Sequence, residues 1–263
     1  RSLHLALSGI KLARMILLED NPRVDHLKEE WALLAKAEKE ESDEQGKVVF
    51  SFPRKDGKFT VFIEDESSRI NLNMTEHPNQ PKASVRRNLS IIFEEQGLDD
   101  FEKKINYIRD YIDKDDLACA PDLFFSEEKT KNLPLAVPEE VLLVKNFSKA
   151  DYNKTKDFLT IIGDGKININ TVNSELLDVL IEDEGIKREV FKVRFGPNGI
   201  EGDDDDEYYG EGSNPLPLVL AGRFKTFSNF FRIVSKGEIG GARKKISCIL
   251  NREKNTIAYW YEE

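Results

Sequence analysis

The spacing of hydrophobic residues divides this chain into helical and extended segments. The opening stretch, "SLHLALSGIKLARMILLED", repeats apolar side chains every three or four positions, which predicts a helix that ends before Pro22. Its apolar stripe contains Leu3, Leu7, Ile10 and Leu17. The next stretch, "RVDHLKEEWALLAKAEKEE", predicts a second helical segment, whose apolar side carries Leu27, Trp31 and Leu34.

Two other regions alternate apolar and polar residues, which is typical of strands. "KVVFSFPRKDGKFTVFIEDE" predicts a hairpin around the turn "KDGK", and its second strand alternates through Phe59, Val61 and Ile63. "FFRIVSKGEIGGARKKISCILNREKNTIAYWYEE" predicts three antiparallel strands with turns near "SKGEIGG" and "REKN". One face of the middle strand carries Ile246, Cys248 and Leu250.

The segments between these two regions have mainly a helical period. Gly97 suits the C-cap of one predicted helix, and Asp99 with Glu102 resembles a capping box for the next. Thr171 or Asn173 caps a short helix in "SELLDVLIEDEG". "IKREVFKVRF" fits either a helix or a strand, and "GPNGIEGDDDDEYYGEGSNPLP" predicts a loop.

Two phrases of the sequence nearly repeat each other: "SSRINLNMTE" (67–76) and "DGKININTVN" (164–173). Each has a cation, then Ile, Asn, an aliphatic residue and Asn, with a Thr soon after. Aliphatic residues favour extended structure, and Asn side chains cap turns and helix starts. We therefore expect strand-to-helix junctions, where the chain leaves and re-enters a β framework, at Asn71, Asn73, Asn168 and Asn170.

This order of segments predicts an α+β fold in which a large α-helical domain is inserted into an antiparallel β-sheet. Residues 1–73 supply the N-terminal helix and the first strands. Residues 74–165 form the inserted domain, which we expect to extend to about residue 222. Residues 223–263 supply the strands that complete the sheet.

Composition narrows the classes of function. A net charge of −10 and a pI near 5.1 argue against a general nucleic-acid binder, which needs a basic face. No stretch of about 18 apolar residues predicts a membrane span. The histidines are scattered, and no phosphate-binding loop or nucleophile motif occurs, so we expect no enzyme. Cys119 and Cys248 leave both a disulfide and two separate thiols open.

Two acidic segments have the residue types that a hard cation needs. "DYIDKDD" contains Asp113, Asp115 and Asp116, and "DDDDEYYGEG" contains the run 203–206. Calcium takes about six to eight oxygen ligands, several of them carboxylates, but neither segment has the EF-hand spacing. Each segment is therefore either a calcium site or a solvated acidic loop.

Several segments together resemble general secretion pathway protein K, the large minor pseudopilin of bacterial type II secretion. "SGIKLARMILLED" resembles that family's helix after its membrane segment, and "IEDESSRINLN" resembles its strand-then-Asn signature. The stretch from "NLPLAVPEEVLLVKNF" to "DGKININTVNSELLDVL" is the strongest match. "YIRDYIDKDD" is similar to a further segment, with Tyr111 where the family has Trp, and "NFFRIVSKGEI" and "YWYEE" resemble the last strands.

The resemblance implies a pilin-like N-terminal helix laid on an antiparallel sheet, with the α-domain inserted into the sheet. It implies a place at the pseudopilus tip, in complex with I- and J-type minor pseudopilins, where the chain helps to start filament assembly. It also implies contacts with the filament and with the outer-membrane channel or secreted substrate. It implies no contact with nucleic acid. A leader and an apolar anchor before Arg1 are implied, which would place the protein at the bacterial inner membrane with a periplasmic domain.

The resemblance also implies particular residues. Partner binding would use the N-terminal helix through Leu3, Leu7, Ile10 and Leu17, and the first three should be exposed in the isolated chain. Calcium sites in the loops of the family's α-domain map onto Asp113, Asp115 and Asp116. Here the following stretch, "LACAPDLFFSEE", departs from the family's pattern, and "DDDDEYYGEG" reads as a local insertion.

Two other functions fit part of the sequence. A minor pilin of a related type IV filament would share the same fold. A helix-hairpin-helix DNA-binding protein would explain "ININTVNSELLDVL" followed by "EGIKREVFKVR". That motif needs free backbone N–H groups and basic residues beside its hairpin, whereas Glu182, Asp183 and Glu184 precede Gly185 here.

Overall fold

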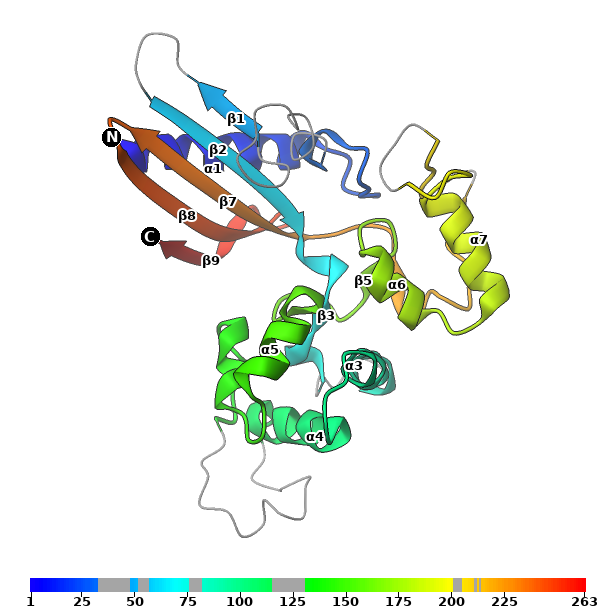
Figure 1. Ribbon diagram of the computed structural model, residues 1–263. Coiled ribbons are helices and arrows are strands. Elements are labelled where there is room, and N and C mark those ends of the chain that lie inside the picture. The colour runs from blue at the N-terminus through cyan, green and yellow to red at the C-terminus, as the bar shows by residue number, and fades with distance from the viewer. Residues whose placement is uncertain are drawn as a thin grey trace. The chain divides into compact units, whose positions relative to one another are not determined.

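The computed structural model describes residues 1–32, 48–51, 57–75, 82–114, 131–200, 205–210, 212 and 214–263. The chain divides into two compact units, each formed by segments that are distant in sequence (Figure 1). Unit 1 comprises Arg1–Glu66, Phe191–Pro215 and Thr226–Glu263. Unit 2 comprises Ser67–Val190 and Leu216–Lys225, so it is an insertion between strands of unit 1.

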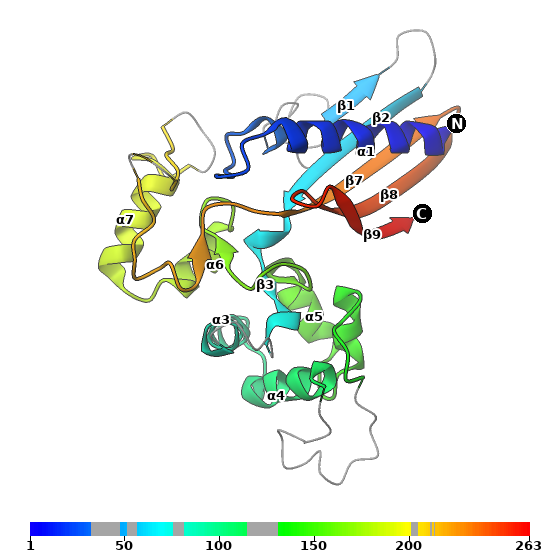
Figure 2. The same cartoon turned by 180° about the vertical axis from the view of Figure 1, so that it is seen from behind.

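In unit 1 a long helix lies on one face of a five-stranded antiparallel sheet (Figure 2). The helix is α1 (Ser2–Glu19), and it contacts β2, β7 and β8. The sheet has the order β1-β2-β7-β8-β9. Its strands are β1 (Val48–Ser51), β2 (Gly57–Asp65), β7 (Phe230–Ile239), β8 (Ala242–Asn251) and β9 (Thr256–Glu262).

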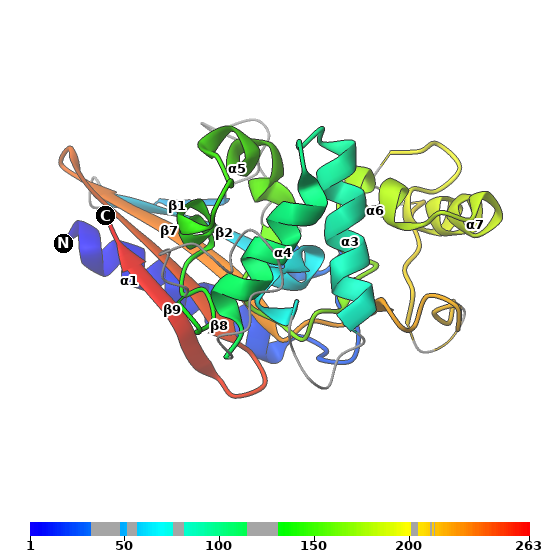
Figure 3. The same cartoon turned by 90° about the horizontal axis from the view of Figure 1, so that it is seen from below.

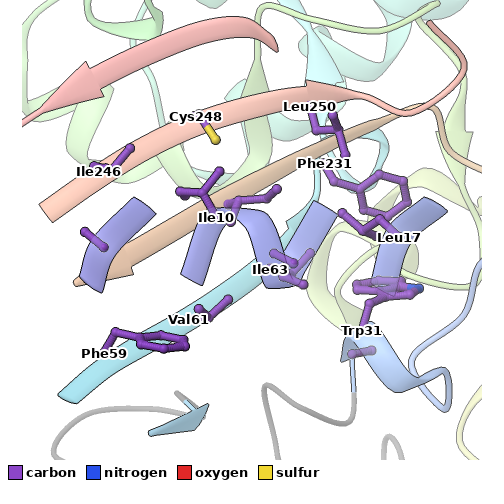
Figure 4. Close-up of a cluster of buried hydrophobic side chains, with 14 residues drawn as sticks. Ile10, Leu17, Trp31, Phe59, Val61, Ile63, Phe231, Ile246, Cys248 and Leu250 are labelled. Atoms are coloured by element: carbon purple, nitrogen blue, oxygen red, sulfur yellow. The ribbon is translucent and has the colours of Figure 1, made fainter. Parts of the chain in front are cut away.

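Alternation along the central strands creates the core beneath α1. The register places Ile63 of β2 opposite Ile233 of β7, and Ile233 opposite Cys248 of β8, so their side chains share one face. All three are buried and form one cluster with the inner side of α1 (Figure 4). Trp31 closes this cluster beyond the helix, with its ring 5.2 Å from that of Phe231 in an edge-to-face arrangement.

Two glycines allow α1 to lie close to β7. A Cβ atom on Gly237 would lie 2.1 Å from the carbonyl oxygen of Ser2 and 2.5 Å from the backbone nitrogen of Ala6. A Cβ atom on Gly9 would lie 2.2 Å from the Ser235 Oγ. All three distances are far below van der Waals contact, so the helix fits against the strand only because these side chains are absent.

Unit 2 consists of short helices and two short parallel strand pairs (Figure 3). The strand pairs are β3 (Ile70–Asn71) with β4 (Leu159–Thr160), and β5 (Ile167–Asn168) with β6 (Phe224–Lys225). The α-helices, in chain order, are α3 (Lys82–Glu95), α4 (Phe101–Ile112), α5 (Lys149–Thr155) and α6 (Ser174–Leu180), and α6 is followed by α7 (Glu184–Arg194). The described residues also contain the 3-10 helices η1 (Glu66–Ser68), η2 (Leu72–Met74), η3 (Pro138–Leu143) and η4 (Lys156–Phe158).

The structure confirms the α+β fold class and most of the elements expected from the sequence. The two strands of the first hairpin and the three C-terminal strands pair as predicted, and the C-terminal turns fall at the expected glycines and at 252–255. The turn of the first hairpin lies outside the described residues. Gly97 has a positive φ of 62° after α3, and Asn173 caps α6 through its side chain. "IKREVFKVRF", which the sequence left open, lies in α7.

Two predicted elements differ from the structure, and the boundaries of the units differ from those of the predicted domains. Residues 21–29 form turns and irregular structure, so the predicted second helical segment begins only at Glu30, and Leu34 lies outside the described residues. The capping box at Asp99 is wrong, because Asp100 in a left-handed conformation precedes α4 and makes no side-chain cap. Glu102 instead binds Ser90 and Arg86 of α3. Unit 2 begins at Ser67 rather than 74, and Phe191–Pro215 belongs to unit 1.

Candidate functional site

The outer face of α1 is the first candidate site, and it contains fewer of the predicted residues than expected. Ile10 is 6% exposed and Leu17 is fully buried, and both pack into the core of unit 1. The expected exposure of Ile10 is therefore wrong, because the apolar stripe of α1 packs onto the sheet. Leu3 and Leu7 are partly buried at the border of the core, so their exposure is only partial.

The exposed apolar residues of α1 lie instead near its C-terminal end. Met15 is 57% exposed and Leu18 is 42% exposed. They follow His4 and Lys11 at helical spacing, so all four share the side of α1 that faces away from the sheet. We call this side the outer face of α1. Met15 and Leu18 were missed because the apolar residues of this helix extend around most of its circumference, and the sequence pattern does not separate the two sides.

The first Asn phrase forms a hydrogen-bonded turn at the end of β3. The side-chain oxygen of Asn71 accepts from the backbone N–H of Asn73 at 3.0 Å, and its amide donates to the carbonyl of Gly163. The Asn73 amide donates to the carbonyls of Leu135 and Ile161, and its oxygen accepts from the Leu135 N–H. Asn73 therefore joins three segments that are distant in sequence.

The second Asn phrase makes the same local turn at the end of β5. The side-chain oxygen of Asn168 accepts from the backbone N–H of Asn170 at 3.0 Å, which matches the bond between Asn71 and Asn73. Asn168 and Asn170 are both buried. The repeated phrase thus encodes a repeated structure, in which a two-residue strand in a parallel pair ends in an Asn-stabilised turn.

The predicted calcium ligands are only partly described. Asp113 is buried at the C-terminal end of α4, and Asp115 and Asp116 lie outside the described residues. Within the ranges that the structure describes, Asp113 does not belong to a group of three metal-ligand side chains. The described residues thus do not by themselves make a calcium site, and calcium binding stays a prediction. Of the second acidic run, 203 and 204 are likewise outside the described residues.

A buried charge cluster in unit 1 was missed by the sequence analysis. Oxygen atoms of Asp20, Asp25 and Glu29 lie within 4.8 Å of one another. Arg252, in the turn after β8, donates to both Asp25 oxygens at 2.8 and 2.7 Å and lies 3.4 Å from Asp20. Arg252 thus pairs with two of the three acids, and Glu29 accepts from the backbone of His26 and the Trp31 ring N–H. No local signal links these acids to Arg252, because more than two hundred residues separate them.

Ser228 connects this cluster to the end of β2. Its backbone N–H donates to Asp25, its hydroxyl donates to Asp65, and its carbonyl accepts from Arg252. Asp25, Asp65 and Ser228 are all almost completely buried. These bonds fix the start of β7 against the loop after α1, so the cluster holds together the strands on both sides of the insertion.

Burial changes the pKa of the acids and of a nearby histidine. It raises the pKa of Asp25 to about 7 and that of Glu29 to about 8, and the neighbouring carboxylates add to the effect. Burial lowers the pKa of His26 to about 4, with a further contribution from Lys28. The neutral His26 ring stacks on Tyr208 at 3.7 Å. The described thiol, Cys248, is buried with its pKa raised to about 12, and Cys119 lies outside the described residues.

The α6–α7 hairpin does not present free N–H groups to phosphate. The Asp183 carboxylate accepts from the backbone N–H groups of both Gly185 and Ile186. Glu182 beside it pairs with Arg87. A carboxylate therefore occupies the position that a phosphate would take in a helix-hairpin-helix motif.

Both the sequence and the fold of this chain can be compared with known proteins. No protein-family model and no curated protein matches the sequence. Solved structures match the chain, and one of them is aligned over the whole length of this chain. It is the crystal structure of the GspK-GspI-GspJ complex from the type 2 secretion system of enterotoxigenic Escherichia coli. A chain of that structure aligns with a TM-score of 0.71 and 17% sequence identity, over 100% of this chain and 95% of its own length.

This likeness confirms the fold implied by the sequence motifs. The pilin-like fold, with its N-terminal helix on an antiparallel sheet, is shared with a chain of the GspK-GspI-GspJ complex. Within the described part of the chain, no helix combines the length and the hydropathy needed to cross a membrane.

Proposed function

We propose that this chain is a minor pseudopilin of a type II secretion system. In this proposal it lies at the pseudopilus tip in complex with I- and J-type minor pseudopilins and helps to start filament assembly for protein export. An inner-membrane anchor with a periplasmic domain belongs to the same proposal, and so do contacts with the outer-membrane channel or with secreted substrate.

The observation that carries the proposal is the extent of the structural likeness. It covers both units, including the helical insertion between β2 and β7, and not only the common arrangement of a helix on a sheet. Because a fold alone does not determine a function, the sequence motifs supply separate support. "SSRINLN", "GDGKININ" and the C-terminal strands resemble the same family that the structural likeness indicates.

The partner-binding surface that the structure favours is the outer face of α1. Met15 and Leu18 supply exposed apolar area there, with Leu3 and Leu7 at its border. Ile10 and Leu17 support the helix from below, because they fill the core. An amphipathic helix with exposed apolar residues at helical spacing suits packing against another helix.

Copurification tests the proposed function. The chain is coexpressed with tagged I- and J-type minor pseudopilins and, in parallel, with tagged minor pilins of a type IV filament system. Retention by the pseudopilins alone is the expected result. Retention by the type IV pilins alone would move the chain to that system, and retention by neither would overturn the proposal.

Calcium binding forms a separate part of the proposal. A calcium ion that binds the folded chain would raise its free energy of unfolding by about 2.7 kcal/mol at a hundredfold excess over Kd. Thermal unfolding with calcium and with excess chelator measures this rise. Asp115→Asn and Asp116→Asn should reduce it, and an equal transition temperature in both conditions would show that the segment is a solvated loop.

A further inference from the structure

Charge is distributed unevenly between the two ends of unit 1. One end contains the start of α1, the start of β2 and the turn between β7 and β8, which lies beside the N-terminus in Figures 1 and 2. The closeness of Gly237 to Ser2 confirms that this turn and the start of α1 are neighbours. We call this region the basic end and define it by Arg1, Lys58, Lys236, Arg243, Lys244 and Lys245.

The register of the strands brings these cations together. Lys236 of β7 lies directly opposite Lys245 of β8, and Lys58 of β2 lies opposite Glu238, which lies opposite Arg243. Glu238 is 3.9 Å from Lys58 and 3.4 Å from Arg243, so one carboxylate serves two cations. Lys245 in turn pairs with Glu263 at 2.8 Å.

Few carboxylates compensate the basic end. Among the described residues, six cations stand against three carboxylates there: Glu238 pairs with Lys58 and Arg243, Glu263 pairs with Lys245, and Glu262 lies beside Glu263 in sequence. The difference is three positive charges, on a chain whose net charge is −10. Most of these cations are exposed, and the Arg243 side chain is 79% exposed. Long exposed cations remain hydrated and adaptable, so they suit an anionic surface better than one rigid ligand.

The other end of unit 1 carries the opposite charge. At the end of α1, in the described loop after it, at the end of β2 and in the β8–β9 turn, the carboxylates other than the partly protonated Asp25 and Glu29 are Glu19, Asp20, Glu30, Glu64, Asp65, Glu66 and Glu253. They outnumber the cations described there and at the start of β7, which are Arg23, Lys28, Arg232, Arg252 and Lys254. A unit with oppositely charged ends has a preferred orientation in an electric field, and an anionic surface attracts one end while it repels the other.

We propose that the basic end of unit 1 binds the anionic headgroups of a lipid bilayer. The β7–β8 turn and the start of α1 then lie against the membrane surface, and the acidic end points away from it. Juxtamembrane cations attract anionic lipids in this way, and the attraction declines within a Debye length as salt is added. Trp260 and Tyr261 of β9, which are 40% and 50% exposed, are residue types enriched at such interfaces.

An acidic protein surface is the other anionic partner that such a region could meet. The choice of a bilayer rests on the proposed function, in which an apolar anchor precedes α1 and keeps the start of that helix at the membrane. The cations also come from a helix end, a strand start and a turn, and Lys and Arg side chains of this kind do not need a fixed arrangement of acceptors to bind a fluid headgroup layer.

Vesicle flotation tests the proposal. The chain is mixed with vesicles of phosphatidylcholine alone or with an equal share of phosphatidylglycerol, at low and high salt. Binding to the anionic vesicles at low salt, weakened by high salt and absent from neutral vesicles, is the expected result. Binding to neither vesicle, or equally to both, would overturn the proposal.

Two matched lysines on β8 or just beyond it provide the control. Lys244→Gln at the basic end should weaken binding about fivefold, because one cation near an anionic bilayer contributes about 1 kcal/mol. Lys254→Gln, an exposed lysine in the turn at the acidic end, should leave binding unchanged. Equal effects of the two changes would contradict an oriented contact. Circular dichroism verifies that both variants are folded.

Two further results separate this proposal from its alternatives. Binding to immobilised polyglutamate without binding to anionic vesicles would assign the basic end to an acidic protein. Copurification with minor pseudopilins requires no vesicle, so it reports on the proposed function independently. A Lys244→Gln variant that keeps its pseudopilin partners but loses vesicles would support the lipid contact specifically.

Discussion

Single polar residues fix positions where the backbone of this protein changes direction. Asn73 shows this clearly, because one side chain bonds the backbone of Leu135 twice and that of Ile161 once. The sequence predicted a junction at this position from the repeated phrase. It could not predict the partners, because their distance in sequence is 62 and 88 residues and only the folded chain brings them together.

Loss of the Asn73 side chain should destabilise unit 2. Asn73→Ala leaves two carbonyls and one N–H without this partner, and we expect a loss of about 2–3 kcal/mol in the free energy of unfolding. Asn153→Ala is the control, because Asn153 is an exposed residue of α5. Urea denaturation compares the variants. Similar midpoints for both would show that the bonds of Asn73 contribute nothing net.

The buried charge cluster should make stability depend on pH. Asp25 and Glu29 have pKa values near 7 and 8 in the folded protein, far above those of an unfolded chain, so the folded state holds protons that the unfolded state has lost. Stability from these groups is complete at low pH and declines as pH rises through the folded values. The effect of His26 on stability has the opposite sign, because its lowered pKa makes the free energy of unfolding rise with pH. That rise is complete above pH 6.5, the unperturbed pKa of histidine.

The clearest window is therefore pH 6.5 to 8, between the unperturbed value of His26 and the pKa of Glu29. We expect the free energy of unfolding to decline there by up to about 1.4 kcal/mol per pH unit for each proton that the folded state holds and the unfolded state does not. Denaturant titrations followed by the fluorescence of the buried Trp31 measure the slope. Glu29→Gln should reduce it, and a stability that rises across this window would refute the assignment.

Elements were predictable where one period continued without interruption. β7 alternates buried and less buried residues over most of its length, and the glycine and "REKN" turns that flank β8 are strong local signals. Local signals failed where tertiary contacts decided the outcome. Glu102 looked like a capping residue, but Ser90 and Arg86 bind it instead. The turns at 21–29 were also missed, because their stabilising partners, such as Thr226, are remote in sequence.

The contact between α1 and β7 depends on glycine. In Gly237→Ala the new methyl group would meet the backbone of Ser2 and Ala6, which cannot rotate away as a side chain does. We expect a loss of about 1–3 kcal/mol or more, with α1 displaced from the sheet. Gly222→Ala is the control, because a Cβ atom there meets nothing within 4 Å. Thermal unfolding measures the stability of both variants. Equal transition temperatures for the two would contradict the close packing of α1 on β7.

The whole molecule combines two units that the sequence divides only approximately. The expected insertion exists, since unit 2 lies between β2 and β7 in the chain, yet β2 and β7 pair directly in the sheet. Composition could not show that the segment 191–215 belongs to unit 1, because the contacts that place it there, such as that of Lys28 with Asp206, join residues far apart in sequence. The partner-binding residues were predicted only in part for a related reason. The sequence of α1 does not show which of its sides packs against the sheet, and the structure does.

The central claim is that this chain joins other minor pseudopilins through the outer face of α1. Sedimentation velocity on an equimolar mixture with I- and J-type minor pseudopilins tests it most directly. Three forms of the chain are compared: wild type, the double variant Met15→Glu/Leu18→Glu, and the control Leu218→Glu. Leu218 suits the control because it is 92% exposed and lies in unit 2. We predict one heavier species for wild type and the control, and a loss of affinity of about tenfold or more for the α1 variant. Separate species for wild type, or a complex unaffected by the α1 changes, would contradict the account.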